Sequence, residues 1–465
     1  MEVTIERILP GGLGLAHAEG QTVMVALAAP GDRLRVRVDR VKGNVSFAQI
    51  EEILTPSPLR VEPPCPYFGR CGGCDFQQMA YQAQLDAKVE IIKDCLRRLA
   101  RIEDIPDFQI TGAPNPWHYR SRAQWQYDAV RQKLGYFESG SRNVCDVAEC
   151  AVLAPWLQQT LESLRARMGD GSLPESARDF RAVVGDDDVS ISPPLGSNRK
   201  PSSIPRLGLP LPLGEGRGEG LSNEQPQRVP LPQPFSQREK GDTTVRAGNE
   251  PTGKSAKVRQ ITRTIHGEAY RLNAESFFQG NDGLLPELIE AAIGEVTGET
   301  ALELYCGVGL FTLPLARRFK HVVGVESESA ASKFARENLL EAGLTNAEIA
   351  IRDVGVWLDD LRRHDLSRLS ESSATALQGQ IDFVLLDPPR TGAESRVIAG
   401  VLGLKPQRIS YVSCDPATLA RDLKKLMAGG YTLSSVRAFD MFPQTHHVET
   451  VTHLRCDFWK RMRLS

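Results

Sequence analysis

Short apolar runs alternate with helical stretches through the C-terminal part of the chain, from residue 258 to residue 465. The apolar runs are "TALELYC", "HVVGVE", "AEIAI", "IDFVLLD", "RISYVS", "TLSSVRAFD" and "VETVTHLRC". This alternation predicts an α/β fold with a doubly wound, largely parallel sheet, and we assign that domain to residues 281–465. Ligands of such sheets bind beyond the carboxyl ends of the strands, so the residues directly after these runs are candidates for a site.

The segment "ALELYCGVGLFTLPLARRF" has the pattern of a strand, a glycine loop and a helix. Gly307 and Gly309 let the backbone turn tightly and approach a ligand. The third glycine of the dinucleotide fingerprint is absent because Thr312 occupies its place, which disfavours a pyrophosphate. Glu326 ends the next strand, where it can accept hydrogen bonds from a ribose, and Asp353 closes the strand after that. This Rossmann-like pattern favours S-adenosylmethionine over NAD, and a glycine turn without a ligand is the alternative.

Two later strands end in Asp387 and Cys414, and both residues can take part in chemistry. Asp415 is a candidate N-cap, and Pro416 fits the first position of a helix. A thiol at the positive end of a helix is expected to have a lowered pKa and to form a thiolate. The alternative is a small buried residue without reactivity. Together with Tyr305, these strand ends should meet in one crevice.

A thiolate beside a methyl donor fits one reaction especially well, the methylation of carbon 5 of a uracil ring. That carbon is a poor nucleophile until a thiolate adds to carbon 6, and a base must then remove the proton at carbon 5. The segment "MFPQTHHVETV" offers Glu449 as this base. His447 could orient a substrate or the glutamate, but an exposed pair of His446 and His447 without a role is the default expectation.

A cluster of cysteines stands in "CPYFGRCGGCDFQ", where Cys65, Cys71 and Cys74 have the spacing C-x5-C-x2-C. This spacing predicts a metal site, which needs a fourth ligand. The sequence leaves three candidates for it, Cys95, Cys145 and Cys150. Zinc is the usual metal for four cysteines. Nine cysteines in a chain without a recognisable export signal indicate a reducing cytoplasm.

Residues 1–54 contain β-rich runs and the turn-rich stretch "LPGGLGLAHAEG", which predicts a small five-stranded barrel of the OB type. Arg33, Arg35 and Arg37 alternate and should share one strand face, either to follow RNA phosphates or as a solvated edge. The net charge of −2 leaves any nucleic-acid binding to such local patches. The chain has no apolar stretch long enough to span a membrane.

Residues 63–184 are expected to form a central unit that bears the cysteines and is completed by residues 258–280. One helix of this unit has a predicted buried stripe of Leu85, Val89, Ile92, Leu96 and Leu99. Residues 185–257 are rich in Pro, Gly and Ser and lack periodicity. They predict a disordered insertion.

The motifs "NAESFFQGN", "LELYCGVG", "LDPPR", "YVSCDPATLARDL" and "FPQTHHVE" resemble, in this order, those of bacterial RNA uridine-5 methyltransferases. The resemblance implies that Cys414 is the nucleophile and Glu449 the base, and that Asp387 contacts the donor or the uracil. Many relatives have Asn where this chain has Leu310. The other residues that the resemblance assigns to S-adenosylmethionine are Gln279, Tyr305, Glu326 and, on the adenine, Asp353.

The N-terminal strands resemble the TRAM module of these enzymes, which binds RNA. Ribosomal-RNA members have the same cysteine spacing, a fourth cysteine in a stretch similar to "ECAVL", and a [4Fe–4S] cluster, which selects Cys150 here. The resemblance implies ribosomal RNA as substrate, of the large-subunit 23S type, with transfer RNA as the alternative. A non-catalytic RNA-binding or iron–sulfur protein stays open. A methyltransferase for exocyclic amines would need no thiol and typically has an aromatic residue in place of Arg390.

Overall fold

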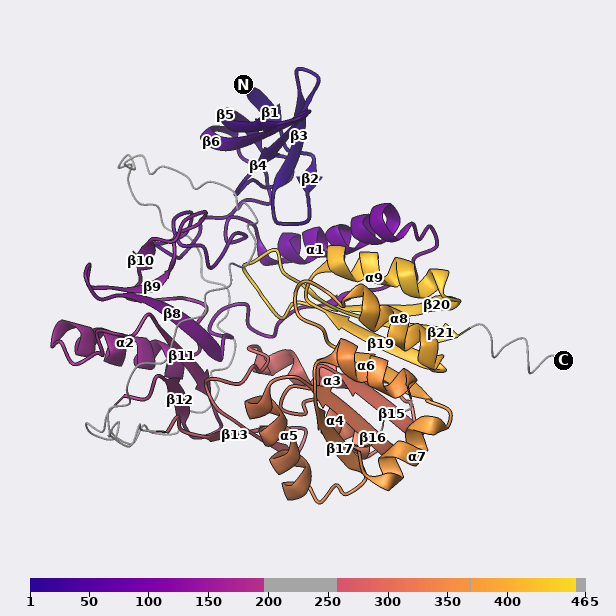
Figure 1. Ribbon diagram of the computed structural model, residues 1–465. Helices are drawn as coiled ribbons and strands as arrows, with labels where there is room; N and C mark the ends of the chain where they lie inside the picture. The colour runs from indigo at the N-terminus through magenta and orange to yellow at the C-terminus, as the bar shows by residue number, and fades with distance from the viewer. Residues whose placement is uncertain (196–256, 364, 366, 368, 457–465) are drawn as a thin grey trace.

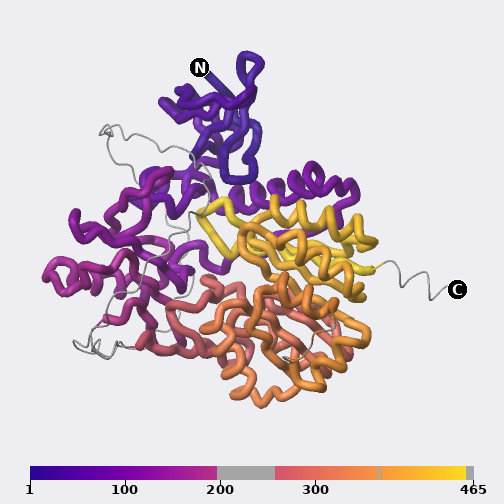
Figure 2. Tube along the Cα trace, in the orientation of Figure 1, coloured from indigo at the N-terminus to yellow at the C-terminus, as the bar shows by residue number. Residues whose placement is uncertain are grey.

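The computed structural model describes residues 1–195, 257–363, 365, 367 and 369–456 (Figure 1). They form an N-terminal β unit, a central unit and a C-terminal unit around an eight-stranded sheet. The tube in Figure 2 shows the N-terminal unit at one end of the molecule, next to the long helix α1 (Tyr81–Cys95). Residues 196–256 of the predicted insertion lie outside the described residues. The start of the insertion differs from the prediction, because β12 (Val189–Ser192) pairs with β11 (Asp179–Val184).

The N-terminal unit is a six-stranded sheet in the order β1-β5-β6-β4-β3-β2, whereas five strands were expected. The turn-rich stretch contains a strand of its own, and "EVTIERI" breaks into two strands because the amide of Ile5 donates to Asp32 instead of continuing the ladder. Alternating residues such as Leu34 and Val36 fill its core. The strands are β1 (Glu2–Thr4), β2 (Arg7–Ile8), β3 (Gly14–Ala18), β4 (Gln21–Val25), β5 (Arg33–Lys42) and β6 (Val45–Thr55).

The central unit is an antiparallel sheet in the order β10-β9-β8-β11-β12, covered by helix α2 (Pro155–Gly169). Its other strands are β8 (Arg122–Asp128), β9 (Lys133–Phe137) and β10 (Val144–Asp146). The hairpin of β13 (Ile261–Ile265) and β14 (Glu268–Leu272) was expected to complete this unit. It forms a two-stranded sheet of its own that contacts both units, since the Asp186 amide of the central unit donates to the Thr262 carbonyl (2.8 Å) and Tyr270 packs in the core of the C-terminal unit.

Helix α1 continues into the π-helix η1 (Leu96–Ala100). Leu85, Ile92 and Leu96 of the predicted stripe are buried, but Leu99 is 45% exposed. A π-turn holds more residues per turn than an α-helix, so the phase of the stripe shifts and Leu99 leaves the buried face. Lys88 is fully buried on this helix, which the stripe did not predict.

The C-terminal sheet has the order β17-β16-β15-β18-β19-β21-β20-β7. The first five strands are parallel, while β21 is antiparallel to both of its neighbours. The predicted strands are present as β15 (Gly298–Leu304), β16 (Phe319–Glu326), β17 (Ala347–Ile351), β18 (Phe383–Leu386), β19 (Arg408–Ser413), β20 (Tyr431–Phe439) and β21 (Glu449–Cys456). The edge strand β7 (Ile110–Thr111) was not predicted and comes from the central part of the chain.

Helices cover both faces of this sheet, as the doubly wound prediction requires (Figure 1). One face carries η2 (Asp282–Leu284), α3 (Leu285–Ile293), α4 (Thr312–Ala316) and α5 (Ser329–Glu341). The other carries α1, α6 (Val354–Arg362), α7 (Glu371–Gln378), α8 (Ser395–Leu404) and α9 (Pro416–Ala428). Strand order reverses between β15 and β18, which places the expected binding crevice beyond their carboxyl ends. In the described part of the chain, no helix is long and apolar enough to cross a bilayer.

Candidate active site

Three predicted site residues follow directly after neighbouring strands. Leu304 pairs with Leu386 and with Val325, so Tyr305, Asp387 and Glu326 come next at one edge of the sheet. The Tyr305 amide donates to the Val325 carbonyl (2.9 Å), which holds the end of β15 against β16. The structure therefore brings together the residues that were predicted to meet there.

Cys414 and Glu449 come together through the antiparallel pairing of β19 with β21. Ser413 pairs with Thr450, so Cys414 and Glu449 are the next opposed positions. Opposed residues of antiparallel strands have Cα atoms about 4.5–5.5 Å apart. Glu449 is 1% exposed, and within the described residues neither of its carboxylate oxygens has a hydrogen-bond partner. A buried carboxylate without partners is costly, and such a group is typical of a site that a substrate completes.

The α9 helix begins after Cys414 as expected. Asp415 is the N-cap and accepts a hydrogen bond from the Thr418 amide (2.8 Å), and Pro416 is the first helical residue. The expected lowering of the thiol pKa is wrong, however. Burial, with the nearby Glu449 carboxyl, raises the pKa of Cys414 to about 12, although the Arg390 guanidinium acts in the opposite direction. Desolvation thus outweighs the helix terminus.

The two carboxyl groups of the crevice are also perturbed. Desolvation raises the pKa of Asp387 to about 7. Burial and the neighbouring Asp387 raise the pKa of Glu449 well above its ordinary value, while Arg390 lowers it. Asp387 therefore stands close enough to act on Glu449, and Arg390 supplies a positive charge beside Glu449.

The glycine loop is held by Glu326, one of whose carboxylate oxygens accepts a hydrogen bond from the Gly307 amide (3.0 Å). Gly309 has φ +92°, and a Cβ there would lie 3.2 Å from Leu313, so glycine is required. Thr312, which replaces the third glycine, donates its hydroxyl proton to the buried Glu303. This bond explains why a threonine occupies that position.

Asp353 and Gln279 were also predicted to bind the donor, and Leu310 and Cys306 belong to the glycine loop. Asp353 caps α6 through the Val356 amide (3.0 Å) and pairs with Arg396 (3.0 Å), and Gln279 is 4% exposed. Leu310, which stands where many relatives have Asn, has its side chain in the apolar core. Cys306, inside the glycine loop, is buried and packs against Gly324. The assignment of Asp353 and Gln279 to the donor stays a prediction.

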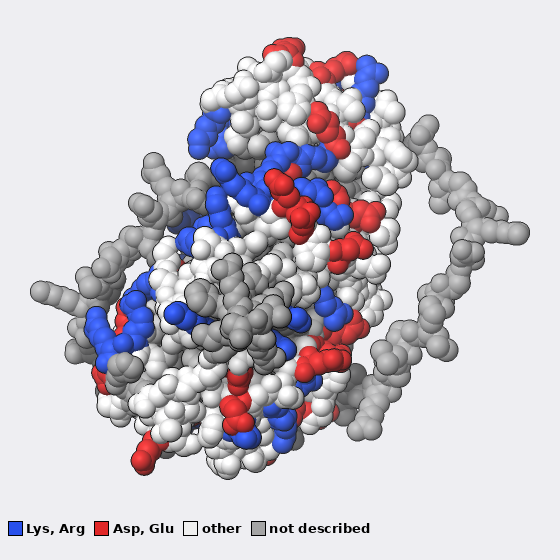
Figure 3. All heavy atoms as spheres, turned by 90° about the vertical axis from the view of Figure 1, so that its right-hand side faces the viewer, with Lys and Arg blue, Asp and Glu red and all other residues white. Residues whose placement is uncertain are grey.

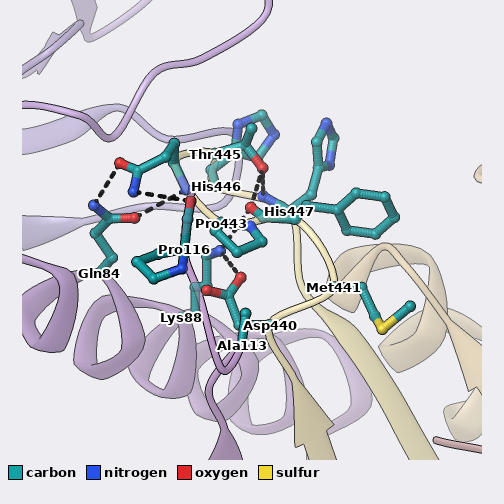
Figure 4. Close-up of polar contacts among 12 residues, drawn as sticks. Gln84, Lys88, Ala113, Pro116, Asp440, Met441, Pro443, Thr445, His446 and His447 are labelled. Atoms are coloured by element: carbon teal, nitrogen blue, oxygen red, sulfur yellow. Dashed lines mark hydrogen bonds and ion pairs between the residues drawn. The ribbon is translucent and has the colours of Figure 1, made fainter. Parts of the chain in front are cut away.

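The loop between β20 and β21, residues 440–448, is anchored on the central part of the chain (Figure 4). Lys88 of α1 forms a fully buried ion pair with Asp440 and donates to the Phe442 carbonyl (3.1 Å). Gln84, also on α1, exchanges two hydrogen bonds with Gln444 (3.0 and 3.1 Å). No local pattern marks Lys88, because its partner lies about 350 residues away in the sequence.

The expectation of an exposed, idle histidine pair is wrong. His446 Nδ1 lies 2.5 Å from an Asp75 carboxylate oxygen, and the His447 Nε2 lies 3.5 Å from Arg390 Nη1. Desolvation and the adjacent His446 lower the pKa of His447 to about 2, so its imidazole is neutral. His446 and His447 therefore belong to the surroundings of the crevice.

The four predicted metal-ligating cysteines, Cys65, Cys71, Cys74 and Cys150, line one pocket. Cys145 accepts a hydrogen bond from Arg70 Nε (3.3 Å), and Cys95 is the last residue of α1 and lies in the core of the C-terminal unit. Among the described residues, no three His, Cys, Asp or Glu side chains converge closely enough to hold a single metal ion. The assignment of Cys65, Cys71, Cys74 and Cys150 to a bound metal or cluster stays a prediction.

Arg33, Arg35 and Arg37 share the exposed face of β5, as predicted. Each has an acidic neighbour, since Arg33 pairs with Glu2 (3.0 Å), Arg35 with Glu2 and Glu52, and Arg37 with Asp39 and Glu51. Figure 3 shows basic and acidic side chains intermixed over the face that it draws. This arginine face is therefore largely neutralised in the free protein.

Comparison with known proteins supports the same class of enzyme. Residues 257–456 match the family model described as tRNA (uracil-5-)-methyltransferase, and residues 1–50 match the TRAM domain. An uncharacterized RNA methyltransferase of Halalkalibacterium halodurans is 31% identical over 98% of this chain and 96% of its own length. The 23S rRNA (uracil(1939)-C(5))-methyltransferase RlmD of Alkalilimnicola ehrlichii is 32% identical over 97% of this chain and 95% of its own.

One solved structure has the same fold over nearly the whole chain. It is the tRNA (uracil-54, C5)-methyltransferase of Pyrococcus abyssi in complex with S-adenosyl-L-homocysteine, with a TM-score of 0.65, 23% identity, and coverage of 98% of this chain and 100% of that chain. The chain therefore belongs to the RNA (uracil-5-)-methyltransferase family and is an S-adenosylmethionine-dependent RNA methyltransferase with an N-terminal TRAM domain.

Proposed function

We propose that the protein methylates carbon 5 of one uridine in RNA through a transient bond between Cys414 and carbon 6 of the base. The observation that carries this proposal is the opposition of Cys414 and the unpartnered, buried Glu449 across β19 and β21. A methyltransferase that acts on an exocyclic amine needs neither a thiol nor a second carboxylate beside it. A non-catalytic RNA-binding protein has no use for a buried carboxyl group that lacks a partner among the described residues.

The residues divide the reaction between them. The Cys414 sulfur adds to carbon 6, and the electron pair displaced from the ring makes carbon 5 nucleophilic, so that it takes up the methyl group. Glu449 then accepts the proton from carbon 5, and the bond between sulfur and carbon 6 breaks. Because the target base must reach Cys414 in the crevice, it has to leave its stack.

Both groups must lose a proton before they can act, since burial raises their pKa values in the free protein. S-adenosylmethionine supplies the methyl group and a positive sulfonium when it is bound. A positive charge near these groups lowers their pKa values, as Arg390 already does. The reactive thiolate is therefore a property of the loaded site rather than of the helix terminus.

The donor site that we propose lies at the strand ends around the glycine loop. Glu326 and Asp353 would accept hydrogen bonds from the ribose and the adenine, and Asp387 would contact the donor or the uracil. The loop glycines permit close approach of the backbone, as their positive φ angles support. The remaining donor contacts are assigned to Gln279, Tyr305, Gly307 and Gly309.

The proposed substrate is ribosomal RNA of the 23S type. The RlmD relative at 32% identity and the cysteine pocket support it. Transfer RNA is the second candidate, because the matching family model is named for it. We also propose that Cys65, Cys71, Cys74 and Cys150 hold a [4Fe–4S] cluster. The cluster would join distant parts of the central unit, since its ligands come from two segments about 75 residues apart.

A test of the reaction uses RNA that contains 5-fluorouridine, together with the methyl donor. Fluorine at carbon 5 cannot leave as a proton, so a stable adduct between protein and RNA should form and resist denaturing electrophoresis. Cys414→Ala should abolish the adduct, while Cys306→Ala should leave it. An undiminished adduct with Cys414→Ala would overturn the assignment of the nucleophile. Mapping 5-methyluridine in ribosomal and transfer RNA with and without the protein distinguishes the two substrates.

A further inference from the structure

The segment that leads into Glu449 is held from outside the C-terminal unit. Glu449 is the first residue of β21, and the nine residues before it, 440–448, form the loop of Figure 4. The Asp75 and Phe76 amides both donate to the Gln444 carbonyl (3.1 and 3.0 Å). Gln444 itself has φ +67°, a left-handed conformation that the surrounding contacts must maintain.

Asp75 is the centre of these contacts. One carboxylate oxygen accepts a hydrogen bond from the His446 amide (2.8 Å), and the other lies 2.5 Å from His446 Nδ1. A single side chain thereby fixes both the backbone and the imidazole of His446. Asp75 directly follows Cys74, which lines the cysteine pocket, so a single residue connects this pocket to the hydrogen bonds that hold the loop.

The N-terminal unit contacts the same point. Gly12 lies in the turn between β2 and β3, with φ +80°. A Cβ at this position would lie 3.1 Å from an Asp75 carboxylate oxygen and 3.1 Å from the His446 Cβ. Gly11 has φ +89° but open space around it. The turn of the TRAM domain thus lies against the pair of Asp75 and His446, and of its two glycines only Gly12 would bring a Cβ within 4 Å of the pair.

From His446 the contacts continue to the crevice. The rings of His446 and His447 have centroids 4.1 Å apart, and His447 Nε2 lies 3.5 Å from Arg390 Nη1. Arg390 belongs to the group that includes Cys414 and Glu449. Two residues after His447 the chain reaches Glu449. Residues of all three units are therefore in contact along one short path to the proposed base.

We propose that Asp75 is a positioning residue for Glu449. Gly12 of the TRAM domain packs against the pair of Asp75 and His446, so that Glu449 is aligned only when the three units are in contact. This inference rests on the proposed function, because it concerns the step in which Glu449 removes the proton from carbon 5. It gives the TRAM domain a part in catalysis in addition to RNA affinity.

The proposal predicts which step fails. Addition of Cys414 and uptake of the methyl group precede proton removal, so a displaced base leaves the methylated adduct intact and slows only its breakdown. A misplacement of about 1 Å can lower the rate of a step about a hundredfold. General disorder of the site would instead lower the formation of the adduct as well.

The experiment compares Asp75→Ala, Asp75→Asn, Gly12→Ala and Gly11→Ala in the full-length protein, with natural uridine RNA and methyl donor. Iron and sulfide contents and the RNA dissociation constant of each variant establish that the cluster site and RNA binding are retained. For Asp75→Ala we expect kcat to fall at least about tenfold with kcat/KM within about twofold of the wild type, and the methylated protein–RNA adduct to accumulate. Asp75→Asn keeps an acceptor for the His446 amide and should be intermediate.

The two glycine variants are a matched pair. Both introduce an alanine at a positive φ and should carry similar backbone strain, but only Gly12→Ala presses on Asp75 and His446. Gly12→Ala should therefore accumulate adduct, and Gly11→Ala should behave as the wild type. Wild-type kcat with Asp75→Ala, or equal behaviour of the two glycine variants, would overturn the proposal. If wild-type protein forms no adduct even with 5-fluorouridine RNA, the proposed function itself fails.

Discussion

Glu303 offers a direct test of the physical account of the site, because it is a carboxyl group that the fold holds in an unfavourable place. It is 1% exposed beneath the glycine loop, where one oxygen accepts the Thr312 hydroxyl proton and the other has no partner among the described residues. Burial, with the nearby Asp387 and Glu326 carboxyls, raises the pKa of Glu303 to about 8. Glu303→Gln keeps the shape and the acceptor for Thr312 but cannot ionise.

The free-energy penalty of ionising Glu303 follows from the shift of its pKa. The pKa rises from an ordinary 4.5 to about 8, and each unit corresponds to about 1.4 kcal/mol, so the penalty approaches about 5 kcal/mol. Because the pKa of Glu303 is higher in the folded than in the unfolded state, the wild type has its full stability below about pH 4.5, where Glu303 is protonated in both states. This stability is lost as the pH rises toward and through 8. The gain of Glu303→Gln over the wild type should thus be small at pH 4.5 and grow to a few kcal/mol by pH 8.

The assay is the unfolding temperature from pH 4.5 to pH 8.5. For a domain of 150–250 residues, each kcal/mol corresponds to about 2–4 °C, so Glu303→Gln should unfold several degrees above the wild type at pH 8. Glu62→Gln, a change of an exposed glutamate, is the control and should have no effect. Parallel pH profiles of Glu303→Gln and the wild type would show that Glu303 ionises normally and would refute the reasoning.

Two further predictions concern the anchors of the site. Lys88→Met leaves Asp440 buried without its cation and should lower the free energy of unfolding by about 3–5 kcal/mol. The double variant of Lys88→Met and Asp440→Leu should recover most of this loss. Urea unfolding measures both variants, and additive losses would contradict the buried pair. Cys71→Ser should remove iron and the brown chromophore from anaerobically purified protein, while Cys95→Ser should retain them. Stoichiometric zinc in colourless wild-type protein would rule out the cluster.

The strands of the C-terminal unit could be predicted because their apolar runs are buried on both faces, and the cap formed by Asp415 and Pro416 is a local signal. The opposition of Cys414 and Glu449 could not be derived in the same way. It depends on β21 entering between β19 and β20 in the antiparallel sense, which no local pattern encodes. The resemblance supplied the pair, and the register explains its geometry.

The wrong predictions for Cys414 and His446 have a common physical cause, since both residues depend on neighbours that are distant in the sequence. The thiol of Cys414 was expected to respond to its helix, but burial beside Glu449 dominates its pKa. His446 was treated as a surface residue because its partner Asp75 lies about 370 residues earlier. Leu99 differs for a local reason, the π-turn, which interrupts an otherwise regular periodicity.

Glu449→Gln, incubated with natural RNA and methyl donor, tests the central claim most directly. The account predicts that this variant stops with its RNA bound covalently to Cys414 and with the methyl group already on carbon 5, a species that peptide mass spectrometry identifies at residue 414. Normal turnover without any trapped species, or a bond at another residue, would contradict it.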